Sequence, residues 1–234
     1  MSRRRPTRAA TWFVAVLLLA VLAGCARVRA RPAAPTWTPP PPPRVLVLGD
    51  SYTAGHGASP ATAGFAYLLR GSLGWDVTVD GVGGSGYLAT GNHGEGSYLT
   101  RLARAAPGPF DLVLLQGGSN DEHRPVDRLE PAVAATVTAA SKRYPGARVA
   151  LMGPVAVFGV VTPEKAAVHG VLERYAAASG LAFVDPIDEG WFVRGDAKTM
   201  VDRATGHPDN AGYGRIRDRF VIDATRLGLL PRAG

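Results

Sequence analysis

The clearest indication of the fold of this chain is the segment Val45-Leu46-Val47-Leu48-Gly49-Asp50-Ser51. Four consecutive β-branched or leucine residues without alternation predict a strand that is buried on both faces. The glycine that follows allows a sharp turn, so Ser51 is expected at the carboxyl end of this strand. Because ligands of open α/β sheets bind at that edge, Ser51 is a candidate functional residue.

The segments that surround this strand predict an α/β domain. Further strands are expected over Asp76–Val82, Asp111–Gln116, Arg148–Met152 and Leu181–Asp185. Segments rich in Ala and Leu with helical spacing occupy Ala61–Leu73, Val126–Arg143, Pro163–Ser179 and Asn210–Arg226. The glycine-rich stretch Gly81–Gly96 predicts a long loop. Alternation of strands and helices over this length is typical of a three-layer α/β/α sandwich with a mainly parallel, five-stranded sheet.

Three polar motifs lie downstream of Gly49-Asp50-Ser51, in the order Gly83-Gly84-Ser85-Gly86, Gly118-Ser119-Asn120-Asp121 and Gly206-His207-Pro208. A Gly-Asp-Ser motif alone recurs by chance, but this ordered set of four motifs is specific. A serine hydroxyl is a weak nucleophile that needs a neighbouring base, and an imidazole titrates near neutrality. The nucleophile-elbow motif Gly-x-Ser-x-Gly is absent from the sequence, which argues against an ordinary α/β-hydrolase.

Over roughly residues 44–226 the pattern resembles the SGNH hydrolases, or GDSL esterase/lipase family, whose fold is flavodoxin-like. Ser51, Gly84, Asn120 and His207 match the four blocks of that family. The resemblance implies that Ser51 is the nucleophile and His207 the general base. It also implies an oxyanion hole made of the backbone N–H groups of Ser51 and Gly84 and the side-chain amide of Asn120. No metal and no cofactor are implied.

Two of these assignments have alternatives. Gly83 or Gly86 is an alternative to Gly84 as the backbone donor. Four other histidines compete with His207, but none of them lies in a Gly-His-Pro turn before a C-terminal helix: His56, His93, His123 and His169.

The acid that would orient the imidazole departs from the family pattern. The family places an Asp three residues before the His, and Ala204 occupies that position here. Asp202 lies five residues before His207, and we expect it to serve as the triad acid through a longer loop. A backbone carbonyl in a Ser–His dyad and another acid, such as Asp196, are the alternatives.

The N-terminal residues predict export and anchoring. Arg3, Arg4, Arg5 and Arg8 precede an uncharged apolar stretch of twelve residues, Trp12–Ala23, which is too short to span a bilayer. We therefore expect residues 1–24 to be a signal peptide. Leu22-Ala23-Gly24-Cys25 resembles a bacterial lipobox, which makes Cys25 the expected lipidation site and the domain extracytoplasmic; an ordinary signal peptide with an incidental Cys is the alternative.

Composition sets further bounds on the mature protein. Cys25 is the only cysteine, so the domain over residues 44–234 has no intramolecular disulfide and relies on its core. Residues 25–43 are expected to form a linker, because a run of five prolines, 39–43, prefers an extended conformation. Removal of residues 1–24 lowers the net charge from +7 to +3, since it removes four Arg and no acidic residue. We expect no nucleic-acid partner, and a monomer.

Together these observations predict a lipid-anchored serine esterase or lipase that hydrolyses a carboxylic ester through an acyl-enzyme on Ser51. The resemblance leaves open whether the substrate is a short-chain ester, a lipid, a thioester or an acetylated sugar. An acyltransferase acting on envelope glycan or lipid is one alternative function. A non-catalytic envelope module that has lost the triad acid is another.

Overall fold

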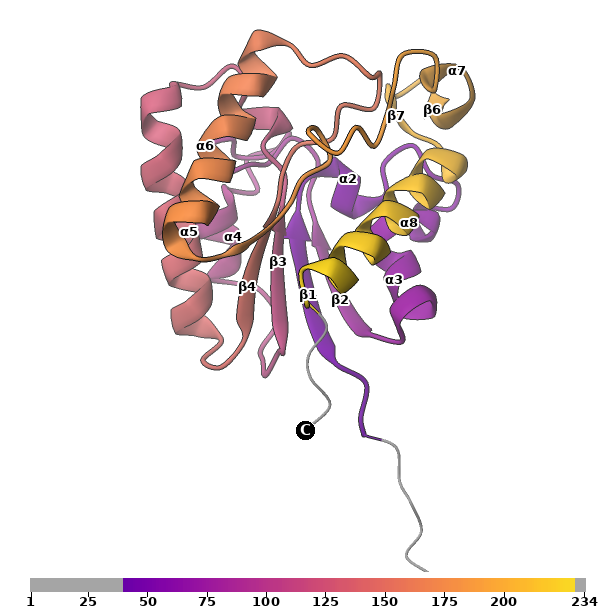
Figure 1. Cartoon of the computed structure of the whole chain (residues 1–234). Helices are drawn as coiled ribbons and strands as arrows, with labels where there is room; N and C mark the ends of the chain where they lie inside the picture. Colours follow the sequence, from indigo (N-terminus) through magenta and orange to yellow (C-terminus); the bar gives the residue numbers. More distant parts are fainter. Residues whose placement is uncertain (1–39, 230–234) are drawn as a thin grey trace, which may run out of the picture. The chain divides into compact units, whose positions relative to one another are not determined.

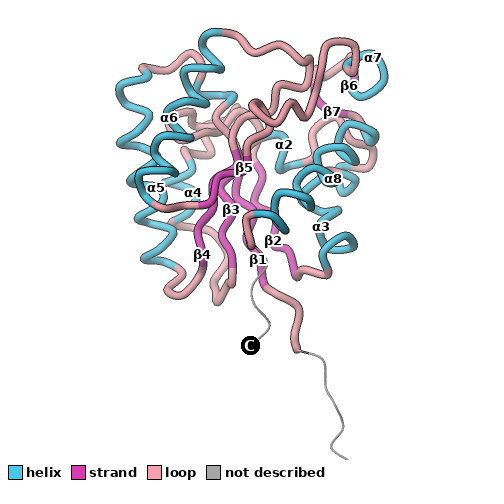
Figure 2. Tube along the Cα trace, viewed as in Figure 1, coloured by secondary structure: helices cyan, strands magenta, loops and turns pink. Residues whose placement is uncertain are grey.

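The computed structural model describes residues 40–229, which hold an α/β domain with its own core. A five-stranded parallel sheet in the order β2-β1-β3-β4-β5 lies at its centre (Figures 1 and 2). The strands are β1 (Arg44–Gly49), β2 (Asp76–Gly81), β3 (Leu112–Gln116), β4 (Arg148–Met152) and β5 (Ala182–Val184). The predicted three-layer α/β/α sandwich is confirmed.

Helices cover both faces of the sheet (Figure 1). The longer ones are α3 (Phe65–Leu73), α5 (Leu129–Arg143), α6 (Pro163–Ser179) and α8 (Asn210–Arg226). Val45 and Val47 pack in one core with α3 and α8, whereas Leu46 and Leu48 pack in the other core with α5 and α6. Alternate residues of β1 therefore enter opposite cores, which explains why its sequence is apolar without alternation.

Most expected elements have the expected bounds, and the differences lie at their ends. The first predicted helix is divided into a 3₁₀ turn, η1 (Ala61–Ala63), and α3, and the second is divided into η3 (Val126–Arg128) and α5. In α6, Thr162 caps the first turn and Gly180 ends the helix with a φ of 64°. The stretch after β2 is the expected long loop.

Several short elements have no counterpart in the predictions. They are α2 (Ser51–Ala54), α4 (Tyr98–Leu102), η2 (Ser119–Asp121), α7 (Ala197–Met200) and the two-stranded hairpin of β6 (Val201–Asp202) and β7 (His207–Pro208). Such segments are too short to carry a periodic signal. Within residues 40–229 no helix is long and apolar enough to cross a membrane. The predicted signal peptide, Cys25 and most of the linker lie outside the described residues.

Candidate active site

Ser51 is the first residue of α2, directly beyond the carboxyl end of β1. The carboxylate of Asp50 caps this short helix by accepting a hydrogen bond from the Tyr52 backbone N–H, at 2.9 Å. The turn is tightly packed, since a Cβ on Gly81 would lie 2.2 Å from the backbone nitrogen of Ala54. The end of β2 thus lies directly against α2, and this contact fixes where Ser51 is presented.

His207 lies beside Ser51, although the two residues are 156 positions apart in the sequence. It lies in β7, between the β6–β7 turn and α8, and Gly57 packs against its Cβ. Its Nε2 atom is 2.8 Å from the Ser51 hydroxyl oxygen. The His207 ring also contacts the rings of Tyr52 and His56, with centroids 5.5 and 4.6 Å away. The structure therefore brings the predicted nucleophile and base together.

The other ring nitrogen of His207 is bound by a backbone carbonyl. Nδ1 lies 2.9 Å from the carbonyl oxygen of Thr205, which can only accept, so Nδ1 carries the proton. Nε2 is then free to accept the proton of the Ser51 hydroxyl. This tautomer is the one that a general base at this position requires.

The expected contact between Asp202 and the imidazole is not formed. The Asp202 carboxylate accepts hydrogen bonds from the Thr205 hydroxyl at 2.7 Å and from the Ala204 backbone N–H at 3.3 Å. Asp202 and His207 pair across the β6–β7 hairpin, and the tight turn leads the Thr205 carbonyl, instead of the carboxylate, to Nδ1. The other acid considered, Asp196, forms an ion pair with Arg215 at 2.6 Å.

The surroundings of His207 favour its neutral form. Burial lowers the pKa of His207 below its ordinary value, and the charge of His56 acts in the same direction. The hydrogen bond to the Thr205 carbonyl and the charge of Asp202 oppose this shift without cancelling it. A neutral imidazole at physiological pH can accept the hydroxyl proton.

The glycine-rich loop after β2 passes beside Ser51. A Cβ on Gly83 would lie 3.9 Å from the Ser51 Cβ. Gly84 has a φ of +76°, and a Cβ there would lie 2.1 Å from the side-chain oxygen of Asn92. The backbone conformation and the Asn92 side chain therefore both require a glycine at this position.

Three hydrogen-bond donors that the sequence singled out are available at this site. Among residues 40–229, neither the backbone N–H of Ser51 nor that of Gly84 donates a hydrogen bond. The side-chain amide of Asn120 donates one hydrogen bond to the Ser85 carbonyl, at 2.9 Å, and has a second hydrogen to offer. Unused donors beside a nucleophile can stabilise a negatively charged oxygen.

Asp121 holds the glycine-rich loop in place. Its buried carboxylate accepts three hydrogen bonds of 2.9 Å from the backbone N–H groups of Tyr87, Leu88 and Ala89. Gly86 is also required here, because a Cβ on it would lie 2.5 Å from this carboxylate. Asp121 follows Asn120 in the motif Gly118-Ser119-Asn120-Asp121. That motif did not indicate that the Asp121 carboxylate would bind the glycine-rich loop.

Arg101 is a second supporting residue that sequence reasoning missed. It is buried in α4 and donates to the Gly49 carbonyl at 2.8 Å and to the Ser85 hydroxyl at 2.7 Å. It also forms an ion pair with Asp80 at 2.5 Å. One guanidinium thus joins the ends of β1 and β2 to the glycine-rich loop. Its only sequence signal is a charge within a short, otherwise uncharged helix.

A cavity of about 230 Å³ opens beside the Ser51 hydroxyl. Ser51, His207 and Asn120 line one part of it, and the segment 155–158 with Val160 supplies an apolar part. Lys165 also lines the cavity, but its ammonium group is paired with Glu122 at 2.5 Å. This volume is below the range of about 300–1,000 Å³ that is usual for ligand sites, and it suits a short group.

Comparison with known proteins identifies the family. The model of the GDSL-like lipase/acylhydrolase family matches residues 47–215. The chain belongs to this family. A GDSL lipase of Mycobacterium tuberculosis is 31% identical to it over 190 residues, which cover 76% of this chain and 79% of the relative. The GDSL-like lipase/acylhydrolase family and this lipase relative support an ester hydrolase, as the sequence predicts.

Solved structures share the fold of this GDSL family member. TesA is 26% identical, with a TM-score of 0.60 over 79% of this chain and 99% of TesA. Est24, a carbohydrate acetylesterase from Sinorhizobium meliloti, is 18% identical, with a TM-score of 0.61 over 80% of this chain and 100% of Est24. The salicylyl-acyltransferase SsfX3 is 17% identical, with a TM-score of 0.65 over 85% of this chain and 57% of that protein.

Proposed function

We propose that this protein is a serine esterase that hydrolyses carboxylic esters through an acyl-enzyme on Ser51. The observation that carries the proposal is the 2.8 Å hydrogen bond between Ser51 and a His207 whose other nitrogen is already protonated. A non-catalytic module would have no need to keep a nucleophile, a base and unused donors together.

In the proposed reaction, His207 Nε2 takes the hydroxyl proton while the Ser51 oxygen attacks the ester carbonyl carbon. The tetrahedral intermediate collapses, the alcohol leaves with the proton from His207, and the acyl group remains on Ser51. Water then attacks the acyl-enzyme with His207 again as the base, releasing the carboxylic acid and restoring the serine. The Thr205 carbonyl stabilises the imidazolium that forms in both halves.

The negative oxygen of the intermediate is proposed to bind the backbone N–H groups of Ser51 and Gly84 and the amide of Asn120. Loss of one such donor typically costs 10²–10³ in rate. The small apolar cavity beside Ser51 supports a short acyl group. Residues 155–158 would contact its hydrocarbon part.

We further propose that the enzyme works outside the cytoplasmic membrane, attached through a lipid on Cys25. The Arg-rich start, the apolar stretch and the lipobox-like sequence support this location. The proposed partners are an ester substrate and the membrane, with no nucleic acid, and the proposed state is a monomer.

The test is hydrolysis of a short-chain p-nitrophenyl ester by residues 40–234, the unit that holds the whole core. Ser51→Ala should abolish turnover and leave the melting temperature within a few degrees. A fluorophosphonate probe should label the wild-type domain and not this variant. Turnover or labelling that survives in Ser51→Ala would show that the nucleophile is elsewhere.

A further inference from the structure

Four large apolar side chains are exposed at the mouth of the active-site cavity. Val193 is 59% exposed, Phe158 51%, and Val160 and Val161 42% each. We call these four residues the apolar lip. The elements that carry them end at the same edge of the sheet as Ser51, toward the top of Figure 1. Singly exposed apolar residues are normal, but a group of them marks an interaction surface.

The four residues come from two loops that touch. A Cβ on Gly159 would lie 2.1 Å from the carbonyl carbon of Val193, so the loop 158–161 lies directly on the segment around Val193. Phe158 and Val160 also line the cavity that holds Ser51 and His207. The lip is therefore one surface, and it is continuous with the route by which a substrate reaches the nucleophile.

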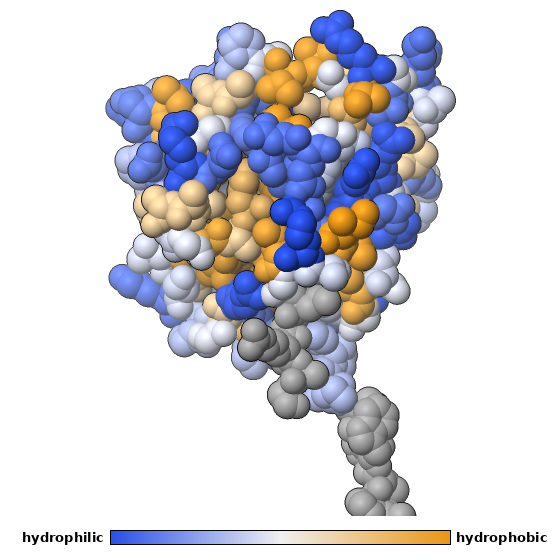
Figure 3. All heavy atoms as spheres, in the orientation of Figure 1, coloured by the Kyte–Doolittle hydropathy of each residue, from blue (hydrophilic) through white to orange (hydrophobic). Residues whose placement is uncertain are grey.

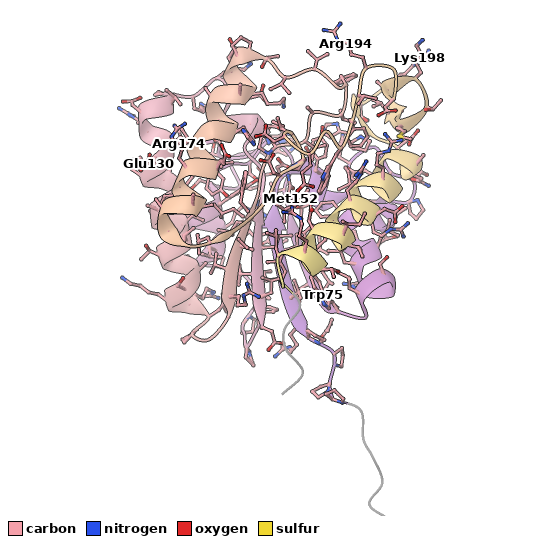
Figure 4. The ribbon with its side chains drawn as sticks, viewed as in Figure 1. Trp75, Glu130, Met152, Arg174, Arg194 and Lys198 are labelled. Carbon is pink, nitrogen blue, oxygen red and sulfur yellow. The ribbon has the colours of Figure 1, made fainter. Side chains whose placement is uncertain are left out.

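Cationic side chains stand beside the apolar lip. Arg194 and Lys198 point outward from this end of the molecule (Figure 4), and Arg203 is exposed in the adjoining hairpin turn. Within residues 40–229 none of the three forms an ion pair. The acid between Arg194 and Lys198 is already paired with Arg215, and Glu164 adds one exposed negative charge near Val161.

The space-filling view agrees with this arrangement. Hydrophobic atoms gather at the upper end of the visible face, and strongly hydrophilic atoms flank them (Figure 3). This arrangement is complementary to the surface of an anionic membrane. The exposed apolar side chains could enter the boundary of the hydrocarbon, and the unpaired cations at their edge could contact the anionic headgroups.

We propose that the apolar lip docks on an anionic lipid bilayer and turns the mouth of the active site toward it. Val161 and Val193 would enter the headgroup boundary, and Arg194 and Lys198 would contact the phosphates. This surface belongs to the domain itself and is separate from the proposed lipid on Cys25. It goes beyond the proposed esterase function, and its test does not depend on turnover.

The experiment is sedimentation with sucrose-loaded vesicles, using residues 40–234 with Ser51→Ala so that no lipid is consumed. Vesicles of phosphatidylcholine with 30% phosphatidylglycerol should bind the protein, and vesicles of phosphatidylcholine alone should bind it much less. Val161→Ser with Val193→Ser should reduce the partition coefficient by about tenfold or more. Arg194→Gln with Lys198→Gln should reduce it by about fivefold for each charge.

Two matched controls separate docking from general surface effects. Ile222→Ser removes an apolar residue of equal exposure, 59%, from α8. Lys142→Gln removes an exposed cation from the last turn of α5, at the end of the sheet opposite Ser51. Both should leave binding unchanged. When Ser51 is retained, the protein with Val161→Ser and Val193→Ser should hydrolyse a water-soluble ester at the wild-type rate, because neither valine lines the cavity.

Three outcomes would overturn the proposal. The first is no binding of the domain to anionic vesicles, and the second is equal loss of binding in the control variants. The third is a dimer, measured by light scattering, that the Val161/Val193 variant dissociates, because the lip would then be covered by a second copy of the chain.

Discussion

The imidazole of His207 is held by two hydrogen bonds of different kinds. Ser51 occupies one nitrogen at 2.8 Å, and a neutral carbonyl oxygen, that of Thr205, occupies the other at 2.9 Å. A carbonyl fixes the tautomer and the ring orientation as a carboxylate would. It supplies less charge to the imidazolium, so the role of the acid is divided between a carbonyl that orients the ring and a carboxylate, Asp202, that acts from a distance.

This division predicts a small effect of removing the Asp202 charge. Asp202→Asn should lower kcat/KM by less than about tenfold, and not by the 10⁴ expected where the acid itself fixes the tautomer. Thr205→Val, which removes the hydroxyl bound to Asp202 but keeps the carbonyl, should have a similar effect. The double variant should add little, because both changes break one contact. A loss near 10⁴ in Asp202→Asn would restore the triad.

A second prediction concerns pH. His207 must be neutral to act as a base, so activity is present above its pKa and is lost as the pH falls through it. Removing the charge of His56 takes away a cause that lowers this pKa, so the pKa should rise. His56→Gln should therefore move the acid limb of kcat/KM to higher pH, whereas His56→Lys, which keeps a positive charge, should not. An unchanged acid limb in His56→Gln would contradict this coupling.

Ser51, Asn120 and His207 could be predicted because each lies in a motif with a distinct residue pattern. The partner of the imidazole could not be predicted, since any residue offers a carbonyl and the direction of that carbonyl depends on the four-residue turn 203–206. Spacing favoured Asp202, but the Asp202–Thr205 bond that closes this turn directs the carboxylate away from the ring.

At the scale of elements, the site depends on how the glycine-rich loop is fixed. The Tyr87 and Ala89 side chains of the loop are buried, and Asp121 and Arg101 hold the loop from η2 and α4. Burial raises the pKa of Asp121, although the three backbone N–H donors favour its charged form. Asp121, which follows Asn120 in the sequence, thus positions the loop that carries Gly84. The placement of the Gly84 N–H group is therefore coupled to the placement of the Asn120 side-chain amide.

This coupling predicts the effect of removing the carboxylate. Asp121→Ala leaves three backbone N–H groups without their acceptor and should destabilise the domain by at least about 2 kcal/mol in urea unfolding. It should also lower kcat, because Gly84 and Asn120 lose their relative placement. Asp121→Asn keeps one acceptor oxygen, so its stability and its kcat should lie between those of Asp121→Ala and the wild type. Full activity in Asp121→Ala would show that the loop is held by other contacts.

Long elements could be predicted from the sequence, and short ones could not. The helices α6 and α8 have the expected bounds: Thr162 caps the start of α6 and Gly180 ends it, and Asp209 caps the start of α8. The hairpin of β6 and β7 has two residues in each strand, so it carries no period. The turn of that hairpin nevertheless determines which group binds His207. It carries the Thr205 carbonyl, the partner of the imidazole that the sequence did not predict.

At the scale of the whole molecule, the fold follows from the five strand candidates, each of which is present in the sheet. The proposed location rests instead on the sequence of residues 1–43, and the expected lipidation gives a direct prediction. Cys25→Ser in the full chain should release the protein from the membrane fraction or leave an uncleaved precursor. Mass spectrometry of the wild-type N-terminus should find an acylated cysteine. An unmodified terminus downstream of Cys25 would contradict the lipobox prediction.

The parallel sheet gives the domain two opposite poles. β1 begins at Arg44 at one pole and Ser51 follows its other end, so the residues just before Arg44 enter the domain at the pole opposite Ser51. A domain of this size is about 40 Å across. Extended at about 3.1 Å per residue, the segment 25–43 would reach about 60 Å.

The linker would therefore act as a leash slightly longer than the body it holds. If Cys25 is lipidated as expected, a linker of this length would allow the apolar lip to reach the same bilayer, with about 20 Å to spare. A deletion of ten linker residues would leave a linker shorter than the domain is wide and should abolish that contact.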